Sequence, residues 1–566
     1  MFPRLRDHWL TMDPRSAGLF RVTIGCVWLL HLADRWALRE DFYSPRGVLP
    51  SSLLAASREI PNFPTIFTAL ESHAWGSGLF FGVAFLAAAA LTAGLFTRGS
   101  ALLSLFAFST LAHRNPYVLI AGDYVLGSML LWLTVLRAGK RFSVDAALRR
   151  RGRDDDFLRE QTSPPRPSLA VLGLLLQLGL IYFATAWQKS GPTWWSDGTA
   201  LSHMLGLHRF LRPGAALVSS LPDSGLVWLT HGVLLFEFLV LPLILLPFAR
   251  PWLRRVTWLG LIALHGGIAC VLDTGSFSIT MLACLPLLLS TADWEWIERL
   301  VAVQTFGSAP ARRSFGLRWS RFLSCERAND SLADNNFEVD GRHLEAAPKF
   351  QSSVKPEHSQ SGRHRTAVRT ATTSWCGITS VASELVSAWL LLGMLCSNYS
   401  LNFAMGRREA PRSWLDLPQR FAAAHQRWDM FAPDAPKFDP QLLVRVRLRD
   451  GRLLSLQSDD LHSDAELPSA GIDLAPRLAP FTWRIYIGHA ILQLNPARQA
   501  ESDALRQVLC RRFLRELRTL GRPLHNIHAI ELWSRAVPTN RRAAELSALE
   551  PVHVSSLLLS EEERRE

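Results

Sequence analysis

The sequence predicts an all-α polytopic membrane bundle of about nine transmembrane helices, followed by a small α+β domain outside the cytoplasm. Three observations lead to this prediction. Long apolar runs dominate the first 291 residues, and basic residues gather in alternate connections between them. Beyond residue 400 the pattern becomes that of an ordinary soluble domain. We therefore expect an integral membrane protein whose first partner is the lipid bilayer.

The apolar runs give the individual spans, because a crossing helix needs roughly 20 mostly apolar residues. Candidates lie at residues 16–34, 76–96, 99–113, 118–136, 168–188, 226–248, 255–272, 275–291 and 381–399. The third and fourth are short and are separated by the turn 113–116, which predicts a tight hairpin. The first run carries Arg21 and lacks a small-residue cleavage site, so we interpret it as a retained helix.

Loop charge predicts the orientation of these spans. The basic segments 1–9, 138–160 and 250–255, together with Arg98, share one face if the spans alternate in direction. Cytoplasmic loops carry the excess of lysine and arginine, so we place the amino terminus in the cytoplasm of a plasma-membrane protein. With nine spans, the carboxy-terminal domain would be external.

Four segments follow along the chain. We expect a transmembrane domain over residues 1–299 and a polar cytoplasmic insertion over 300–380. This insertion is rich in serine and arginine, has no periodicity, and is predicted to be disordered. A last transmembrane helix would cover 381–399, and the extracytoplasmic domain would cover 400–566.

The carboxy-terminal region shows the patterns of both strands and a helix. Residues 444–449 alternate between apolar side chains and arginine before the turn Asp450-Gly451, which predicts a β-hairpin. Residues 482–492 and 526–537 are typical of further strands. The segment 502–521 has leucine and phenylalanine at helical spacing behind a capping serine, which predicts an amphipathic helix.

Charge and motif content exclude several function classes. The basic residues behind the net charge of +12 lie largely between apolar runs, where cytoplasmic loops are expected to carry them. No nucleic-acid partner is therefore expected. The seven cysteines are scattered without a CxxC or zinc-like spacing, and no metal site is predicted. The sequence also lacks HExxH, GxSxG and P-loop spacings.

The segment 182–213 contains the strongest candidate for a site. An apolar helix reaches Trp187, Lys189 follows, Gly191-Pro192 breaks the helix, and Trp194 and Trp195 come next. An ionisable residue beside a break at membrane depth is a functional-site hypothesis, because freed backbone groups need a protein or watery environment there. The alternative is a lysine that only anchors the helix end at the interface.

Other polar residues fall inside the predicted spans, and we expect them to face the bundle interior in pairs. They are Arg21, His31, Asp34, Asp123, Gln177, His231, Glu237 and His265. Arg21 and Glu237 are expected to pair with each other or with Asp123 and so to hold helices together. His265 precedes Gly266-Gly267, which permits close helix approach, and packing and chemistry are equal alternatives for it.

Six segments in one order carry a family resemblance. They are 18-GLFRVTIG-25, 42-FYSPRGVLP-50, 115-NPYVLIAGD-123, 189-KSGPTWWSDGTAL-201, 237-EFLVLPL-243 and 265-HGGIACVLDTGSFSITML-282. Through them the chain resembles the HTTM (horizontally transferred transmembrane) family, which is related to vitamin K-dependent gamma-glutamyl carboxylase. The segment 426-QRWDMFAPDAP-436 is also similar to the sequence that follows the membrane part in many relatives.

The resemblance implies a chemistry. Lys189, five residues before Trp194, would be the base that deprotonates a reduced naphthoquinone resembling vitamin K hydroquinone, and His265 would be a second catalytic residue. The resemblance also implies a pocket formed by Trp194, Trp195, Asn115 and Asp123, and a protein or peptide substrate. The chain departs from the carboxylase at Asn115-Pro116, where the carboxylase has Asn-His.

Three functions are compatible with these observations. The first is a quinol-linked enzyme of the carboxylase or oxygenase type, with Lys189 as base. The second is a non-catalytic membrane protein whose external domain binds a partner, and the third is a carrier of a lipid or small molecule. A pocket beside Lys189 would favour the first or third, whereas a packed Lys189 paired with a carboxylate would favour the second.

Overall fold

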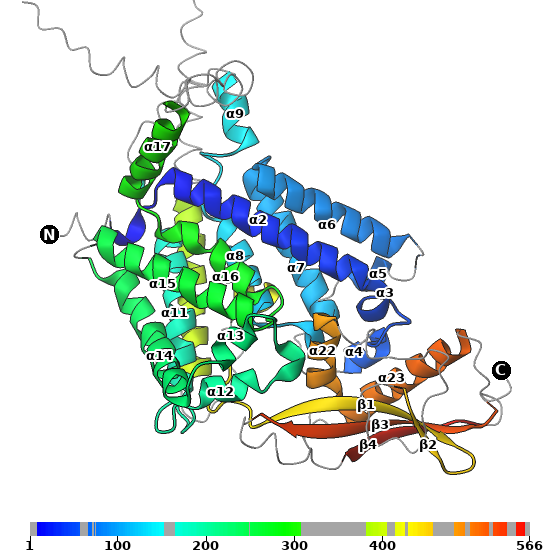
Figure 1. The fold of residues 1–566 in the computed structure, drawn as a ribbon. Helices are drawn as coiled ribbons and strands as arrows, with labels where there is room; N and C mark the ends of the chain where they lie inside the picture. Colours follow the sequence, from blue (N-terminus) through cyan, green and yellow to red (C-terminus); the bar gives the residue numbers. More distant parts are fainter. Residues whose placement is uncertain are drawn as a thin grey trace, which may run out of the picture. The chain divides into compact units, whose positions relative to one another are not determined.

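Helices form most of the part of the chain that the structure describes, and a small antiparallel sheet follows them (Figure 1). The computed structural model describes residues 8–56, 66–70, 73, 75–151, 165–247, 250–306, 381–403, 414–424, 428, 430–456, 480–492, 499–519, 525–539 and 551–560. Two units are present, one made of Met1–Ser290 with Ser383–Glu566 and the other of Thr291–Ala382. The membrane helices and the carboxy-terminal part therefore belong to the same unit. The expected insertion lies outside the described residues from position 307 onward.

The longer helices of the first unit occupy the predicted apolar runs. They are α2 (Pro14–Ala37), α6 (Gly76–Ala93), α7 (Thr97–Arg114), α8 (Ala121–Leu133), α11 (Leu169–Gln188), α14 (Asp223–Leu245) and α15 (Arg250–Val271). Their ends follow from local chemistry. Asp13 caps α2 by accepting from the Arg15 amide, Ser168 caps α11, and Gly94 ends α6 with a positive φ of 70°.

Short helices connect these elements or cover their ends. They are α3 (Arg39–Phe42), α4 (Ser51–Ala56), α5 (Ile66–Leu70), α9 (Val144–Arg151), α12 (Ala200–Leu205), α13 (Ala215–Ser219), α16 (Phe277–Ala283), α20 (Leu417–Phe421) and α22 (Phe481–Tyr486). The 3-10 turns η1 (Pro116–Val118), η2 (His208–Phe210) and η3 (Leu285–Leu288) and the π turns η4 (Tyr399–Phe403) and η5 (Ile487–Ile491) complete the set. The second unit contains α17 (Thr291–Phe306).

Among the described residues, five helices are long and apolar enough to cross a membrane, or six if the bent pair Phe277–Leu288 and Thr291–Leu300 counts as one span. The five are His8–Ala37, Gly76–Ala93, Leu169–Gln188, Asp223–Leu245 and Val381–Phe403. The predicted count of nine is therefore not confirmed. With 13 residues, α8 is about 20 Å long, which is shorter than the hydrocarbon core of about 30 Å. Helices α7 and α15 form where expected but are not among the five.

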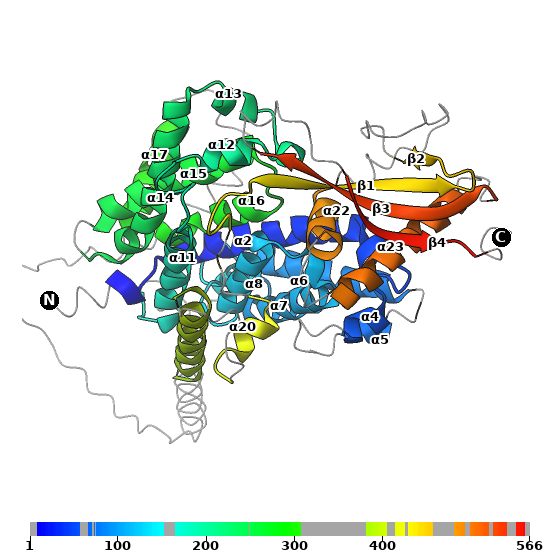
Figure 2. The same ribbon diagram turned by 90° about the horizontal axis from the view of Figure 1, so that it is seen from below.

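The bundle interior is built by close helix contacts. Helix α2 packs against α6 and α8, and α11 packs along α14 (Figures 1 and 2). Gly179 permits the second contact, because a Cβ atom there would lie 2.5 Å from Leu241 Cδ1. Small residues at such positions let two transmembrane backbones approach. This contact brings the last turn of α11 beside the middle of α14.

The carboxy-terminal sheet has the order β2-β1-β3-β4, and all neighbours are antiparallel. Its strands are β1 (Phe438–Leu448), β2 (Leu453–Ser455), β3 (Ile527–Pro538) and β4 (Val552–Leu558). The predicted hairpin is confirmed, with Gly451 at a φ of 89° in its turn. The predicted amphipathic helix is α23 (Gln499–Thr519), which packs on β3 and β4, and the predicted strand 526–537 is β3.

The predicted strand over residues 482–492 is wrong, because these residues form α22 and η5. Trp483, Tyr486, Ile487 and Ile491 are all buried, and their spacing is that of one helical face. A short apolar run does not distinguish a strand from a buried helix by itself, and here tertiary packing decides. Trp483 and Tyr486 pack against Phe42 in tilted and edge-on arrangements, at ring-centroid distances of 4.8 and 5.6 Å.

Candidate functional site

Lys189 lies at the end of α11 and is buried against α14. Its Nζ atom donates a hydrogen bond of 2.6 Å to Oε2 of Glu237, and the two residues are only 4% and 7% exposed. The chain leaves the helix directly after Lys189 through the turn at Gly191-Pro192. The arrangement is a buried ion pair at the end of a candidate membrane span, which is costly unless both charges are satisfied.

The two tryptophans that follow hold Lys189 in different ways. The Trp194 ring faces the ammonium group, with Nζ 4.2 Å from the ring centroid, so it adds a cation–π contact. Trp194 is buried and donates from Nε1 to the Phe431 carbonyl at 2.9 Å. Trp195 is half exposed and donates from Nε1 to the Lys189 carbonyl at 2.7 Å. The turn after α11 therefore wraps around the lysine.

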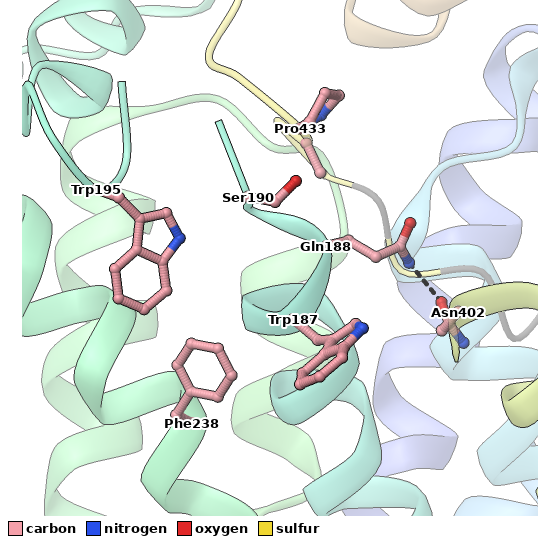
Figure 3. A pocket seen from close by; sticks show the side chains of 8 residues that line it. Trp187, Gln188, Ser190, Trp195, Phe238, Asn402 and Pro433 are labelled. Atoms are coloured by element: carbon pink, nitrogen blue, oxygen red, sulfur yellow. Dashed lines mark hydrogen bonds between the residues drawn. The ribbon is translucent and has the colours of Figure 1, made fainter. Parts of the chain in front are cut away.

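A pocket of about 640 Å³ lies beside this ion pair (Figure 3). It is lined by Trp187, Gln188, Ser190, Trp195, Phe238, Asn402, Ala432 and Pro433. The lining includes chain neighbours of both Lys189 and Glu237, although their own side chains are not part of it. Figure 3 shows aromatic rings on one side and the amides of Gln188 and Asn402 on the other, joined by a hydrogen bond of 2.5 Å.

Aromatic packing continues from the pocket along the helices. Phe183 of α11 lies 5.7 Å from Phe238 of α14 and 6.1 Å from Phe403 of the last span, measured between ring centroids. Trp187 lies 5.9 Å from Phe403. The apolar wall therefore extends from the pocket between three candidate spans, α11, α14 and Val381–Phe403.

His265 occupies a neighbouring position on α15. Its Nε2 atom is 2.6 Å from the Tyr182 hydroxyl, and its Nδ1 atom is buried without a hydrogen-bond partner among the described residues. Tyr182 precedes Lys189 by seven residues on α11, which is two helical turns and about 10 Å along the same face. The structure thus links His265 to the helix that carries Lys189, but His265 does not line the pocket.

Asn115 and Asp123, which the resemblance assigns to the pocket, lie elsewhere. Asp123 binds His31 at 3.1 Å and Arg35 at 3.3 Å, between α8 and α2, and it also accepts from the Ile120 amide at the start of α8. Asn115 is fully buried and donates to the Phe42 carbonyl at 3.1 Å. Asn115 therefore bonds to a backbone carbonyl and Asp123 belongs to a separate ion cluster. Neither residue lines the pocket.

The structure does not bring Arg21 and Glu237 together, which corrects the expected pairing. Arg21 donates from Nη2 to the Phe142 carbonyl at 2.5 Å, whereas Glu237 binds Lys189. Asp123, the other expected partner, binds His31 and Arg35 instead. The reason is packing, because Glu237 lies on α14, which contacts α11 rather than α2.

Comparison with known proteins gives the family. The model of the HTTM domain matches residues 9–294, which is just over half of the chain. The chain belongs to the HTTM family. No curated protein and no solved structure matches it. The matched region of this HTTM protein contains Lys189, Trp194, Trp195, Glu237 and His265.

Part of the HTTM protein's site lies beyond the matched region. Asn402 and the segment 431–435 reach the pocket or the turn around Lys189, and the resemblance gave them no role. A signal for Asn402 was present in the sequence. Asn398 and Asn402 lie four residues apart in an apolar span, and polar residues there usually face other helices. Asn402 does so, since its Oδ1 atom accepts from Gln188 and from the Trp428 amide.

Proposed function

We propose that this HTTM protein binds a lipid-soluble quinol in the pocket beside Lys189 and accepts a proton from it with the Lys189–Glu237 pair. The observation that supports this most is the buried ion pair at the end of α11, next to a pocket with aromatic walls. Ion pairs at membrane depth are rare and commonly mark ion, proton or ligand pathways.

The lining fits a flat aromatic molecule that carries hydroxyl groups. Trp187, Trp195 and Phe238 offer ring faces and edges, and aromatic pairs add about 0.5–1.5 kcal/mol beyond their buried area. Gln188 offers its amide oxygen to a hydroxyl, since its Nε2 atom donates to Asn402. The volume lies within the range of about 300–1,000 Å³ that is usual for small-molecule sites.

A bound quinol would supply an acidic hydroxyl group, and the quinolate formed by loss of that proton would pass two electrons to dissolved oxygen, giving the quinone and, with both hydroxyl protons, hydrogen peroxide. The Lys189–Glu237 pair is neutral as a whole, so the ammonium proton can move to Glu237 along their hydrogen bond of 2.6 Å, and the amine left on Lys189 can then accept the quinol proton. Because neither side chain lines the pocket, a rotation of Lys189 or Glu237 would bring the pair to the ligand. This proposal concerns quinol binding and proton transfer, and it does not include carboxylation of a peptide.

The pocket also supports a second candidate, a carrier of the same class of molecule, because its lining contains neither Lys189 nor Glu237. The pairing of a packed Lys189 with Glu237 favours instead the non-catalytic membrane protein, and such a protein would bind no quinol. A carrier needs the pocket but not the proton transfer. The two candidates therefore differ in turnover and agree in binding.

The test uses the full-length protein in lipid nanodiscs with a reduced naphthoquinone such as menadiol. Binding is measured by calorimetry and oxidation by absorbance, both under defined oxygen. Trp195→Ala should weaken binding about tenfold, because a lost aromatic contact and its buried area are worth about 1–2 kcal/mol. Trp228→Ala is the matched control, since Trp228 lies on α14 with 76% of its surface exposed and does not line the pocket.

The lysine separates the candidates. Lys189→Met should keep binding and abolish oxidation if the protein is an enzyme, and Lys189→Arg should not restore it, since guanidinium does not lose its proton at useful pH. Binding without turnover in the unaltered protein would identify a carrier. If menadiol does not bind, or binds equally to the Trp195→Ala variant, the quinol proposal fails.

A further inference from the structure

A segment of the carboxy-terminal part lies on the turn that follows Lys189. Asp434 accepts two hydrogen bonds at Oδ1, from the Thr193 amide at 3.0 Å and from Thr193 Oγ1 at 2.8 Å. The Ala435 amide donates to the same Thr193 hydroxyl oxygen at 3.0 Å, and the Gly191 amide donates to the Pro433 carbonyl at 2.9 Å. A single aspartate therefore connects two backbone segments that are 241 positions apart in sequence.

The fit at this contact requires a glycine. A Cβ atom at Gly191 would lie 2.2 Å from Asp434 Oδ1 and 2.3 Å from its carboxyl carbon, which is closer than any real contact. The Asp434 carboxylate thus occupies the space that the Cβ atom of any residue type other than glycine would fill at position 191. Gly191 lies in the turn that follows α11, and its lack of a side chain leaves room for the Asp434 carboxylate.

These hydrogen bonds reach Lys189 through the turn. Thr193 is bonded to Asp434, and the next residue, Trp194, presents its ring to the Lys189 ammonium group and bonds to Phe431 of the same carboxy-terminal segment. Pro433, next to Asp434, also lines the pocket. The position of the Trp194 ring is consequently set from both sides by residues 431–435.

We propose that Asp434 is a positioning residue of the site, which acts through Thr193 to hold the Trp194 ring over Lys189 and so to keep the lysine covered. The inference deepens the proposed function and rests on it for any effect on quinol chemistry. The carboxy-terminal part then completes the site rather than serving only as an attached domain.

The test measures the reactivity of the Lys189 amine in the full-length protein, in nanodiscs, with an acylating reagent and site-resolved mass spectrometry. Asp434→Ala and Thr193→Val should each raise the labelling rate about tenfold, the factor for losing one hydrogen bond to a charged group. The double variant should not exceed the larger single effect by more than about twofold, because both changes remove the same contact.

Conservative variants separate positioning from general stability. Thr193→Ser keeps the hydroxyl and Asp434→Asn keeps an acceptor oxygen, so both should label within about twofold of the unaltered protein. Asp41→Asn is the matched control, because Asp41 binds Trp483 and Arg512 of the same carboxy-terminal part away from the pocket. Its labelling should not change.

Two results would overturn the inference. One is an Asp434→Ala protein that labels like the unaltered protein, and the other is an equal rise in the Asp41→Asn control, which would mean that any loosened contact exposes the lysine. If Asp434→Ala does not fold, the comparison of Thr193→Val with Thr193→Ser decides in the same way. The labelling experiment uses no quinol. If the quinol proposal fails but the labelling pattern is the expected one, the role of Asp434 stands.

Discussion

Removing the carboxylate partner of Lys189 should destabilise the folded protein. In Glu237→Gln, the ammonium group stays buried without a counter-charge, and breaking a buried pair in this way costs about 3–5 kcal/mol. The Trp194 ring offsets part of this, since a desolvated cation–π contact is worth about 1–2 kcal/mol. The expected loss in the free energy of unfolding is therefore about 1–4 kcal/mol.

Melting of the purified protein in detergent measures this loss. The unfolding entropy is about 2 cal/mol/K per residue, so the unfolding entropy of a unit of this size is about 1 kcal/mol/K. Tm should therefore fall by about 1–4 °C. The double variant Lys189→Met with Glu237→Leu should recover Tm, because an apolar pair removes both charges. Asp450→Asn is the control, since it breaks an exposed bridge of 2.7 Å to Arg452 and should leave Tm unchanged.

Two outcomes would refute this reasoning. If Glu237→Gln melts like the unaltered protein, the ion pair contributes nothing to stability. If the double variant is as unstable as the single variant, the loss comes from packing around position 237 and not from an unpaired charge.

Three further predictions concern other parts of the chain. Cysteine labelling of intact cells should reach a substituted Ser196 but not Arg151, and labelling of Arg151 alone would reverse the predicted orientation. Burial raises the pKa of Asp273, but hydrogen bonds from two arginines outweigh it and lower the pKa below its ordinary value of 3.8. Asp273→Asn should thus lower Tm at neutral pH, and the difference should disappear as the pH falls through that lowered pKa. Gly191→Ala should disturb the site and expose the lysine to acylation, because the new Cβ has no room, whereas Gly266→Ala should not, since nothing lies within 4 Å there.

The sequence predicted the elements whose periodicity is long and regular. The apolar helices, the hairpin at Asp450-Gly451 and the helix α23 form at the predicted positions. Residues 482–492 did not follow their prediction, because a short apolar run lacks a clear period and its packing on Phe42 selects the helix. The predicted count of nine spans is not confirmed, because some apolar runs of the described residues, such as α8, form helices too short to cross alone.

Only the α11 side of the candidate site could be predicted from the sequence. The helix break at Gly191-Pro192 and the tryptophans after it singled out Lys189, and the structure shows it buried there. Its partner Glu237 was recognised as a buried charge, but the pairing depends on which helices touch, and the contact at Gly179 settles that. Asp434 lies in the segment 426–436 that carries part of the resemblance, but its contact with Thr193 could not be predicted, because the two positions are 241 residues apart.

The separation between Thr193 and Asp434 has a consequence for biosynthesis. Their hydrogen bonds join positions 241 residues apart, and chains grow at about 5–20 residues per second. About 10–50 seconds therefore pass between the synthesis of the lysine turn and the arrival of the aspartate that fixes it. During that interval the helices can already insert, while Thr193 and Trp194 must find water or lipid head groups as temporary partners. A nascent chain can thus insert its membrane helices before the turn after Lys189 has its partner, because Asp434 is synthesised only in the last third of translation.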